Sequence, residues 1–281
     1  MTDPIRLGLI GDNIAKSQAP RLHRLAGMQS GRHVTYERLV PAELGLGFDD
    51  LFATVATSGY RGVNITYPYK ERAAAKVIVR DPLVRAMGAV NTVIFEDGNA
   101  YGFNTDYSGF IAAYRRQRGE APVGAVLLIG AGGVGKAVAF GLIALGLTDL
   151  RIVDLEAEKA HALADALRSI RPEVAISCGS DAVLMAENAE GIVNCTPVGM
   201  VGHDGTPIER SAMGNAGWAF DAVYTPVETQ FLADASAQGL EIISGYELFF
   251  GQGVGAWQIF TGLPLDEARL RRDLASTLDV G

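Results

Sequence analysis

A glycine-rich turn between two apolar segments is the feature that most constrains this sequence. Residues 125–129 form a short apolar run typical of a buried strand, and the turn follows as Gly130-Ala131-Gly132-Gly133-Val134-Gly135. A helical apolar pattern then runs from Lys136 to Leu145. The first, third and sixth positions of the turn are glycines, which gives G-x-G-x-x-G in the strand, turn and helix order of a dinucleotide-binding fingerprint.

Each of these three glycines has its own expected role. Gly130 allows the backbone to turn, Gly132 lets a pyrophosphate approach, and Gly135 lets the helix pack closely on the strand. The phosphates would bind free N–H groups at the helix N-terminus. The next strand ends in Asp154, where an acidic side chain can hydrogen-bond an adenosine ribose. The alternative is a glycine-rich turn in an ordinary α/β domain, and the acid at this position favours the dinucleotide interpretation.

Composition excludes several classes of protein. The chain has 281 residues, of which 48% are hydrophobic, and its net charge is −8. No apolar run reaches the roughly 18 residues of a membrane span, and the acidic balance argues against a nucleic-acid surface. The two cysteines, Cys178 and Cys195, make no disulfide framework, and we expect Cys195 to be buried. The four histidines lack metal-ligand spacing. With no secretory signal at the N-terminus, we expect a cytoplasmic protein without a metal.

Alternation of predicted strands and helices indicates the fold class α/β, with mostly parallel sheets and helices around them. The predicted strands are 5–11, 34–40, 60–65, 125–129, 150–153, 174–177, 191–195, 218–223 and 241–243, with a hairpin of 89–95 and 100–103 around Asp97-Gly98. The predicted helices are 20–29, 44–57, 70–79, 82–87, 104–118, 136–145, 160–168, 182–188, 246–260 and 265–278.

Two residues are candidates for acid–base chemistry. Oxidation of an alcohol by a nicotinamide needs a base for the hydroxyl proton. Lys70 lies just beyond a predicted strand end, where α/β sheets place ligands, and a buried lysine can act as a base. Asp106 lies at the start of a predicted helix. The alternatives are a solvated surface lysine and a helix-capping aspartate.

Uncharged polar residues cluster at predicted strand ends and turns, as the donors and acceptors that a polyol needs. Individually such residues are more often turn residues that bond the backbone. They are Ser17, Asn64, Thr66, Asn91 and Asn104. Gln252 lies between two glycines in an apolar helical pattern, so that helix is expected to pack closely, and the amide needs a partner in a ligand or the backbone.

Seven stretches in order resemble the shikimate/quinate dehydrogenase family over nearly the whole chain. They are Ser17 to His23, Gly62 to Lys70, Gly88 to Thr92, Gly102 to Asp106, Gly130 to Gly135, Asn194 to Met200, and Gln252.

The resemblance implies an N-terminal α/β substrate domain, residues 1–105, completed by C-terminal helices in 246–281. It also implies a Rossmann-type, doubly wound NAD-binding domain over 106–245. The implied activity is hydride transfer between NAD(H) and a ring hydroxyl or carbonyl of shikimate or quinate, in the shikimate pathway of aromatic amino acid biosynthesis. The expected partner is a small polyol carboxylate, and the expected state is a monomer or homodimer.

The resemblance also implies roles for individual residues. Lys70 and Asp106 would form the catalytic pair. The implied substrate-binding residues are Ser17 for the carboxylate, Asn64, Thr66, Asn91 and Gln252 for the hydroxyls, and Tyr224 near carboxylate and nicotinamide. The implied cofactor-binding residues are Gly130, Ala131, Gly132, Gly133, Val134, Gly135, Asp154, Thr196, Pro197 and Met200.

Two departures from the family pattern matter. The family usually has a second hydroxyl residue two positions after the first serine, and this chain has Ala19. The expected consequence is weak carboxylate affinity, unless Ala19 packs under the following helix. Asp154 stands where NADP-using members carry a basic cluster, so we predict NAD as cofactor. The alternatives are a dehydrogenase of an amino analogue such as aminoshikimate, and a cofactor-sensing protein without turnover, which would not need a base.

Overall fold

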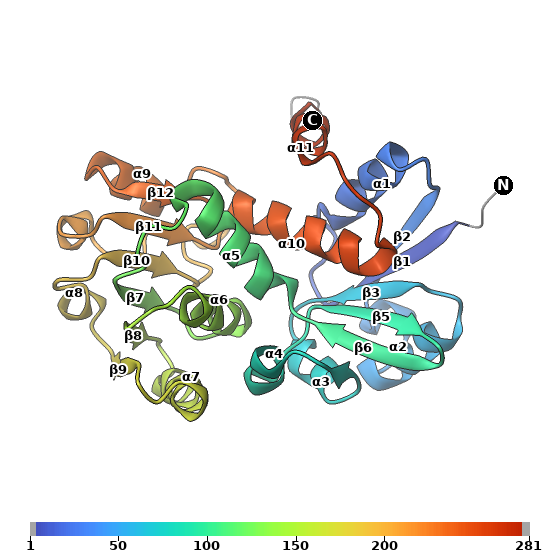
Figure 1. The fold of residues 1–281 in the computed structure, drawn as a ribbon, viewed down its shortest axis with the longest axis horizontal. Helices are drawn as coiled ribbons and strands as arrows, with labels where there is room; N and C mark the ends of the chain where they lie inside the picture. Colours follow the sequence, from blue (N-terminus) through green and yellow to red (C-terminus); the bar gives the residue numbers. More distant parts are fainter. Residues whose placement is uncertain (1–3, 277–281) are drawn as a thin grey trace. The chain divides into compact units, whose positions relative to one another are not determined.

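The computed structural model describes residues 4–276, and the chain divides into two compact units. The first unit combines the chain up to Thr105 with the chain from Gln252 onwards, and the second is Asp106–Gly251. In Figure 1 the first unit is blue to cyan and red, and the second is green to orange. The chain returns to the first unit within one helix, α10 (Gly245–Thr261).

The first unit is built on a mixed sheet. Its strand order is β2-β1-β3-β5-β6-β4. Strand β1 is parallel to β2 and β3, whereas β5 is antiparallel to β3 and to β6. The strands are β1 (Ile5–Ile10), β2 (Val34–Leu39), β3 (Gly62–Ile65), β4 (Ile78–Val79), β5 (Thr92–Glu96) and β6 (Asn99–Phe103). The helices before α10 are α1 (Ala19–Gln29), η1 (Ala42–Leu44, a 3₁₀ helix), α2 (Phe48–Thr57), α3 (Lys70–Ala74) and α4 (Pro82–Met87).

Two helical predictions in this unit were wrong in part. The helix expected over 70–79 ends at Ala74, and Ile78–Val79 is a strand that pairs with β6. The segment Val77 to Val79 is β-branched, which favours a pleated strand once a partner is available. The helix expected over 44–57 begins only at Phe48, because Gly45 adopts a positive φ of 66° that ends the 3₁₀ turn.

The C-terminal half of α10 completes the core of the first unit. Ala256, Trp257 and Phe260 lie in one buried apolar cluster with Leu7 of β1 and Tyr36 of β2. A Cβ on Gly253 would overlap Leu22 of α1. The glycines beside Gln252 therefore serve close packing, as the sequence predicted. The last helix is α11 (Glu267–Ala275), and the expected end at residue 278 lies outside the described residues.

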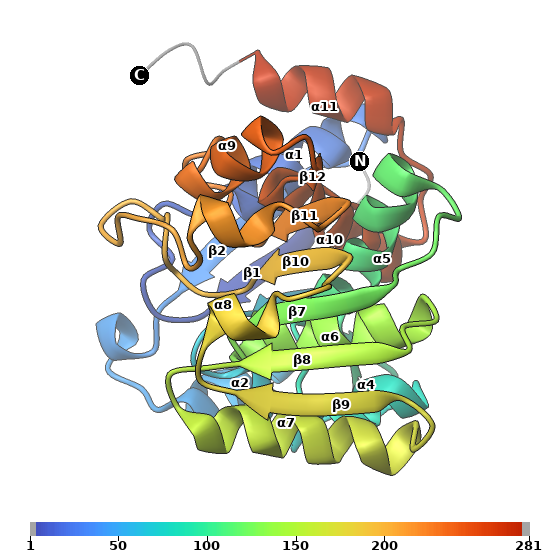
Figure 2. The same ribbon diagram turned by 90° about the vertical axis from the view of Figure 1, so that its left-hand side faces the viewer.

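The second unit contains a wholly parallel sheet in the order β12-β11-β10-β7-β8-β9. Figure 2 faces this sheet. If the strands are numbered 1 to 6 by their order in the chain, they run 3-2-1-4-5-6 across the sheet from β9 to β12. This is the strand order of a doubly wound dinucleotide-binding fold. The strands are β7 (Ala125–Ile129), β8 (Asp149–Val153), β9 (Ala175–Gly179), β10 (Gly191–Asn194), β11 (Trp218–Asp221) and β12 (Glu241–Ile243).

Helices cover both faces of the parallel sheet. Ala219 of β11 lies in a buried cluster with residues of α8 and α9 on one face. Phe220 points the other way because strand side chains alternate, and it meets Phe110 of α5 edge to face at 5.0 Å. The helices are α5 (Thr105–Arg118), α6 (Gly133–Ala144), α7 (Ala157–Ile170), α8 (Ala182–Met185), η2 (Arg210–Met213) and α9 (Gln230–Ala237). Helix α9 was not predicted from the sequence, and Thr229 caps it by accepting from the Leu232 N–H.

Helix α10 is the longest helix of the described chain, with 17 residues. A Cβ on its Gly251 would lie 3.1 Å from the carbonyl oxygen of Gly109 in α5, so α5 and α10 pack closely. Within residues 4–276, the helices are too short or too polar to cross a membrane.

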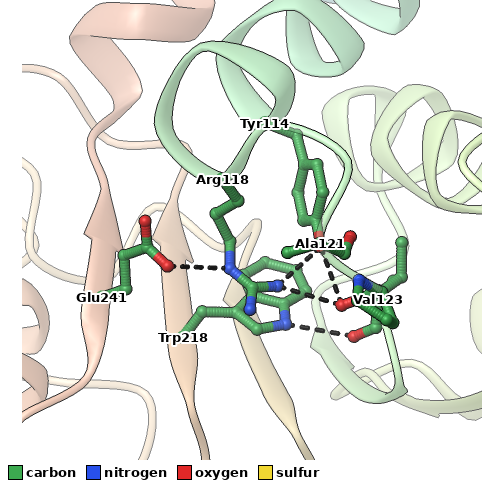
Figure 3. A network of polar contacts seen from close by, with 7 residues as sticks. Tyr114, Arg118, Ala121, Val123, Trp218 and Glu241 are labelled. Atoms are coloured by element: carbon green, nitrogen blue, oxygen red, sulfur yellow. Dashed lines mark hydrogen bonds and ion pairs between the residues drawn. The ribbon is translucent and has the colours of Figure 1, made fainter.

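Arg118 ties the end of α5 to the parallel sheet (Figure 3). Its Nε lies 3.0 Å from Glu241 Oε2 on β12, and it donates to the Tyr114 hydroxyl at 2.6 Å. The guanidinium also lies 5.4 Å from the Trp218 ring centroid. Trp218 Nε1 in turn donates to the carbonyl of Val123. The Arg118 guanidinium therefore fastens the segment between α5 and β7 to strands β11 and β12.

We predict that Arg118→Lys lowers the free energy of unfolding by about 1–3 kcal/mol. A lysine can replace one ion pair, but it cannot bond Glu241 and Tyr114 together while stacking on Trp218. Urea unfolding followed by Trp fluorescence measures the change. Arg115→Lys is the matched control, since Arg115 is exposed on the same helix with Glu120 at 3.9 Å. Equal stability of the two variants would contradict the assignment.

Candidate functional site

The glycine turn after β7 has the geometry that each glycine role requires. Gly130 adopts φ of 99°, and a Cβ there would lie 2.8 Å from the Cys195 carbonyl carbon. A Cβ on Gly135 would overlap the Gly130 carbonyl oxygen, so this glycine allows α6 to approach β7. A Cβ on Gly132 would meet nothing within 4 Å. The fold itself therefore does not require glycine at position 132, and the open space suits a ligand phosphate at the start of α6.

A cavity of about 910 Å³ opens beside this turn. It lies at the carboxyl ends of β7, β8 and β10, where the strand order reverses and doubly wound folds bind ligands. Of the sequence-predicted cofactor residues, it is lined by Gly130, Gly132, Asp154, Thr196 and Pro197. Ala131 is buried, and Gly133, Val134 and Gly135 form the first turn of α6. Met200, 39% exposed, is not among the lining residues within the described chain.

Asp154 is held by two backbone amides. Its Oδ2 accepts from the Ala131 N–H at 2.6 Å, and its Oδ1 accepts from the Glu156 N–H at 2.9 Å. Each carboxylate oxygen keeps a further lone pair. The carboxylate is therefore fixed against the glycine turn and can still accept hydrogen bonds from two ligand hydroxyls.

The cavity has further lining residues that sequence analysis missed. Most of them come from two segments, Ser180 to Val183 and His203 to Glu209, and they also include Leu155 and Val198. The N-cap Asp181 before α8 was a local signal for the first segment, since it accepts from Val183 and Leu184. The second segment carries no motif. Cys195 also lines the cavity and is half-buried, so its predicted burial was wrong in part.

The loop after β10 is anchored on a buried carboxylate. Asn194 Oδ1 accepts from the N–H and hydroxyl of Thr196, while Asn194 Nδ2 donates to Asp221 Oδ1 at 2.9 Å. Asp221 Oδ2 accepts from the Thr229 hydroxyl at 2.5 Å. Burial raises the pKa of Asp221 to about 6, although bonds from Thr229, Val223 and Asn194 oppose the shift.

The first unit contains a second polar cluster, formed by five buried side chains. Asn91 Oδ1 accepts from the Thr105 N–H at 2.7 Å, and the Thr105 hydroxyl lies 3.1 Å from the same oxygen. Thr92 Oγ1 bridges the amides, 3.1 Å from Asn91 Oδ1 and 3.0 Å from Asn64 Nδ2. The Tyr36 hydroxyl donates to Asn64 Oδ1 at 2.8 Å. Asn64 and Asn91 were predicted from the sequence as polar ligand-binding residues, whereas Tyr36, Thr92 and Thr105 were not.

Both candidate acid–base residues are connected through the backbone to this cluster. Lys70 is the first residue of α3, and its carbonyl accepts from the Val90 N–H, next to Asn91. Asp106 directly follows Thr105 in the first turn of α5 and is 8% exposed. Thr66 is half-buried at the end of β3. Asn104 is a structural residue, because its Nδ2 donates to the Ala89 carbonyl.

Ser17 and Ala19 have different surroundings. Ser17 is half-buried, and its Oγ accepts from the Ala19 N–H at 3.3 Å, which leaves the hydroxyl proton for another acceptor. Ala19 is 9% exposed and belongs to the apolar cluster with Leu7 and Ile14. The position of Ala19 supports the packing alternative over a role in carboxylate affinity.

The last two candidates lie on either side of the unit boundary. Tyr224 belongs to the second unit and stacks on Phe249 at 5.1 Å, and burial raises the pKa of its hydroxyl. Gln252 is the first residue of the returning chain in α10 and is half-buried. Within residues 4–276, we find no group of three His, Cys, Asp or Glu side chains placed to hold a metal ion.

We predict that Asp221 makes stability depend on pH. A carboxyl whose folded pKa lies above its unfolded value of 3.8 binds its proton more tightly when folded. Its stabilising contribution is therefore complete below pH 3.8 and is lost as the pH rises through 6. Relative to Asp221→Asn, the wild-type protein should lose roughly 2 kcal/mol between pH 4 and pH 7.

Urea unfolding at both pH values measures this change. Asp165→Asn, on the exposed face of α7, controls for the loss of one carboxylate. A difference in unfolding free energy between wild type and Asp221→Asn that does not change with pH would contradict the raised pKa.

Comparison with known families finds a match over residues 9–93 to the model described as shikimate dehydrogenase substrate binding domain. A quinate/shikimate dehydrogenase (NAD(+)) of Corynebacterium efficiens is 38% identical, over 98% of this chain and 99% of the relative. A shikimate dehydrogenase (NADP(+)) of Pseudarthrobacter chlorophenolicus is 36% identical, over 96% of this chain and 94% of the relative.

Solved structures agree with these relatives. Quinate dehydrogenase from Corynebacterium glutamicum in complex with NAD has a TM-score of 0.91 and 35% identity, over 98% of this chain and all of that one. Shikimate 5-dehydrogenase from Thermus thermophilus, in complex with NADP(H) and shikimate, has a TM-score of 0.85 and 32% identity, over 97% and 99% of the two chains. With relatives this similar along nearly its whole length, the chain belongs to the shikimate dehydrogenase family.

Proposed function

We propose that this protein is an NAD-dependent dehydrogenase that oxidises a ring hydroxyl of shikimate or quinate, or reduces the corresponding ketone. The observation that carries the proposal is the glycine turn, which opens onto a cavity walled by Asp154 at the switch point of a parallel sheet. Relatives named for NAD and for shikimate or quinate support the cofactor and the substrate class. The first unit would bind substrate and the second the cofactor.

The residues around the cavity fit a dinucleotide. The free N–H groups at the start of α6 would hold the pyrophosphate beside Gly132, and Asp154 would accept from the adenosine ribose hydroxyls. A bound nicotinamide supplies a hydride acceptor for the carbon that bears the reacting hydroxyl. Thr196, Pro197 and Met200 would complete the cofactor site.

The chain itself would handle the proton. Lys70 would accept the proton of the reacting hydroxyl as general base, and Asp106 would accept a hydrogen bond that holds the hydroxyl and orients Lys70. Asn64, Thr66, Asn91 and Gln252 would bind the remaining ring hydroxyls. Ser17 and Tyr224 would contact the carboxylate.

We predict that Lys70→Ala lowers kcat by about 10²–10⁴-fold and changes KM much less, because a base acts mainly in the transition state. Asp106→Asn should also lower kcat, and the double variant should lose less than the product of the two effects. Lys76→Ala, which removes a lysine paired with Asp49, is the control. A Lys70→Ala enzyme with wild-type kcat would reject the proposed base, and NAD binding without turnover in the wild type would favour the sensor alternative.

The charges around the cavity support NAD over NADP. Its walls carry Asp154, Glu156, Asp181 and Glu209. The cavity's only lysine or arginine among the described residues is Lys159, whose Nζ lies 2.5 Å from Glu156 Oε1. A 2′-phosphate would therefore meet like charge beside Asp154, and such repulsion can cost several kcal/mol.

We predict a kcat/KM with NAD on the order of a hundredfold above that with NADP. Glu156→Lys should narrow this ratio at least tenfold more than Glu158→Lys, because the two variants change charge equally but only Glu156 lines the cavity. Initial rates with both cofactors measure the ratio. Equal efficiency with NAD and NADP in the wild type, or equal effects of the two variants, would contradict the assignment.

The choice between shikimate, quinate and an amino analogue requires a substrate panel followed by NADH absorbance. Cytoplasmic location and a monomer or homodimer are further parts of the proposal, and both rest on sequence and family resemblance.

A further inference from the structure

The hydrogen-bond network around Asn91 determines which end of each amide is left for a ligand. Asn91 and Asn64 lie on neighbouring antiparallel strands or their ends, and both side chains are buried, 4% and 6% exposed. An amide can present either a carbonyl oxygen or an NH₂ group, and these recognise opposite partners. The orientation follows from the fixed backbone groups that each amide faces.

Asn91 must turn its oxygen into the protein. The atom 2.7 Å from the Thr105 nitrogen faces a backbone N–H, which can only donate, so that atom is Oδ1. The hydroxyls of Thr105 and Thr92, each 3.1 Å away, compete for its other lone pair. Oδ1 is thereby saturated. The described residues provide no acceptor for Asn91 Nδ2, so its two N–H groups remain for a ligand.

The Asn64 amide has the opposite orientation, with its NH₂ group bonded to protein acceptors. Its Nδ2 lies 3.3 Å from the Asn91 carbonyl, a backbone acceptor, and 3.0 Å from Thr92 Oγ1. Both N–H groups are therefore used. Asn64 Oδ1 accepts from Tyr36, whose pKa is raised by burial so that its hydroxyl stays protonated. A side-chain hydrogen bond with His23 also involves Asn64, so each polar atom of the Asn64 amide already has a protein partner.

We propose that this network makes Asn91 an obligate donor to the substrate and so selects a neutral ring hydroxyl over an ammonium group at the position facing Asn91. The inference rests on the proposed function and names the substrate class within it. A hydroxyl has lone pairs that accept from Asn91 Nδ2, whereas an ammonium has only donors. An ammonium at this position would place its own N–H groups against those of Asn91 Nδ2. Neither group would then have an acceptor.

Protonation of His23 does not change which atoms of this network donate and which accept. His23 stacks on Tyr36 at 5.1 Å, and burial lowers its pKa to about 3, which keeps the ring neutral. Lys70 and Asp106 would contact the reacting hydroxyl in either substrate. Their charges act differently on a hydroxyl and on an ammonium elsewhere on the ring, so a variant at position 91 is needed to separate their effect from that of Asn91.

The test compares shikimate with its two analogues in which one unreacting ring hydroxyl is replaced by an amine. At pH 7 the ratio of kcat/KM should favour shikimate by about 10- to 100-fold over the analogue whose amine faces Asn91. As the pH rises towards roughly 10, the amine loses its proton and gains a lone pair. The ratio should therefore fall towards one, while a circular-dichroism spectrum verifies the fold at each pH.

Asn91→Asp separates this effect from a charge on Lys70. The variant keeps the oxygen that accepts from Thr105 but replaces the donor by a second acceptor. It should prefer the ammonium analogue at pH 7 by at least tenfold relative to wild type, and the pH dependence of the ratio should reverse. If the charge of Lys70 caused the discrimination, the preference for shikimate would remain in the variant. Asn99→Asp, exposed on the β5–β6 hairpin, is the matched control and should behave as wild type.

The outcomes distinguish a failure of the proposed function from a failure of this inference. Absence of shikimate and quinate turnover would reject the proposed function and this inference with it. Turnover of shikimate with equal turnover of both analogues, or discrimination unchanged across the amine pKa, would overturn the inference alone. The pH comparison uses the wild-type protein, so unchanged discrimination across the amine pKa overturns the inference even if Asn91→Asp does not fold.

Discussion

The hydrogen bond from the Thr105 N–H to Asn91 Oδ1 is the contact on which the candidate site depends. It satisfies one of the backbone donors that a helix start leaves open, and it does so with a side chain 14 residues earlier. The same bond fixes the Asn91 amide, and through Thr92 it fixes Asn64. Asp106 is the next residue after Thr105. One interaction thus satisfies an open donor at the start of α5 and fixes the orientation of the Asn91 amide.

The glycine turn was predictable because its signals are local. The roles of Gly130, Gly132 and Gly135 follow from their spacing, and the structure gives each glycine a different environment: a positive φ, an open space and a backbone contact. The hairpin around Asp97-Gly98 was predictable for the same reason. Each depends on residues within one turn or one hairpin of the chain.

Features that depend on distant partners could not be predicted. Strand β4 exists because β6 offers an edge to Ile78–Val79, and nothing near residue 78 encodes that pairing. The bond from Ala131 to Asp154 and the cavity lining at residues 203–209 arise from segments brought together by the sheet. Ala19 shows a further limit: a motif position suggested ligand contact, whereas the side chain packs among Leu7 and Ile14. Sequence spacing gives a residue's place in a motif but not the side to which its atoms point.

The two candidate sites use different physics for different ligands. The cavity of the second unit is lined by carboxylates around Asp154, so charge repulsion would act there against a 2′-phosphate. The cluster around Asn91 is built from neutral amides and hydroxyls, with His23 kept uncharged and Tyr36 kept protonated by burial. Such groups keep the same donors and acceptors over the whole neutral pH range. Because a buried charge without a partner is costly, a neutral cluster of this kind suits hydroxyl groups. Any pH dependence of catalysis near neutrality must then arise outside the cluster, in the acid–base residues or in the ligand.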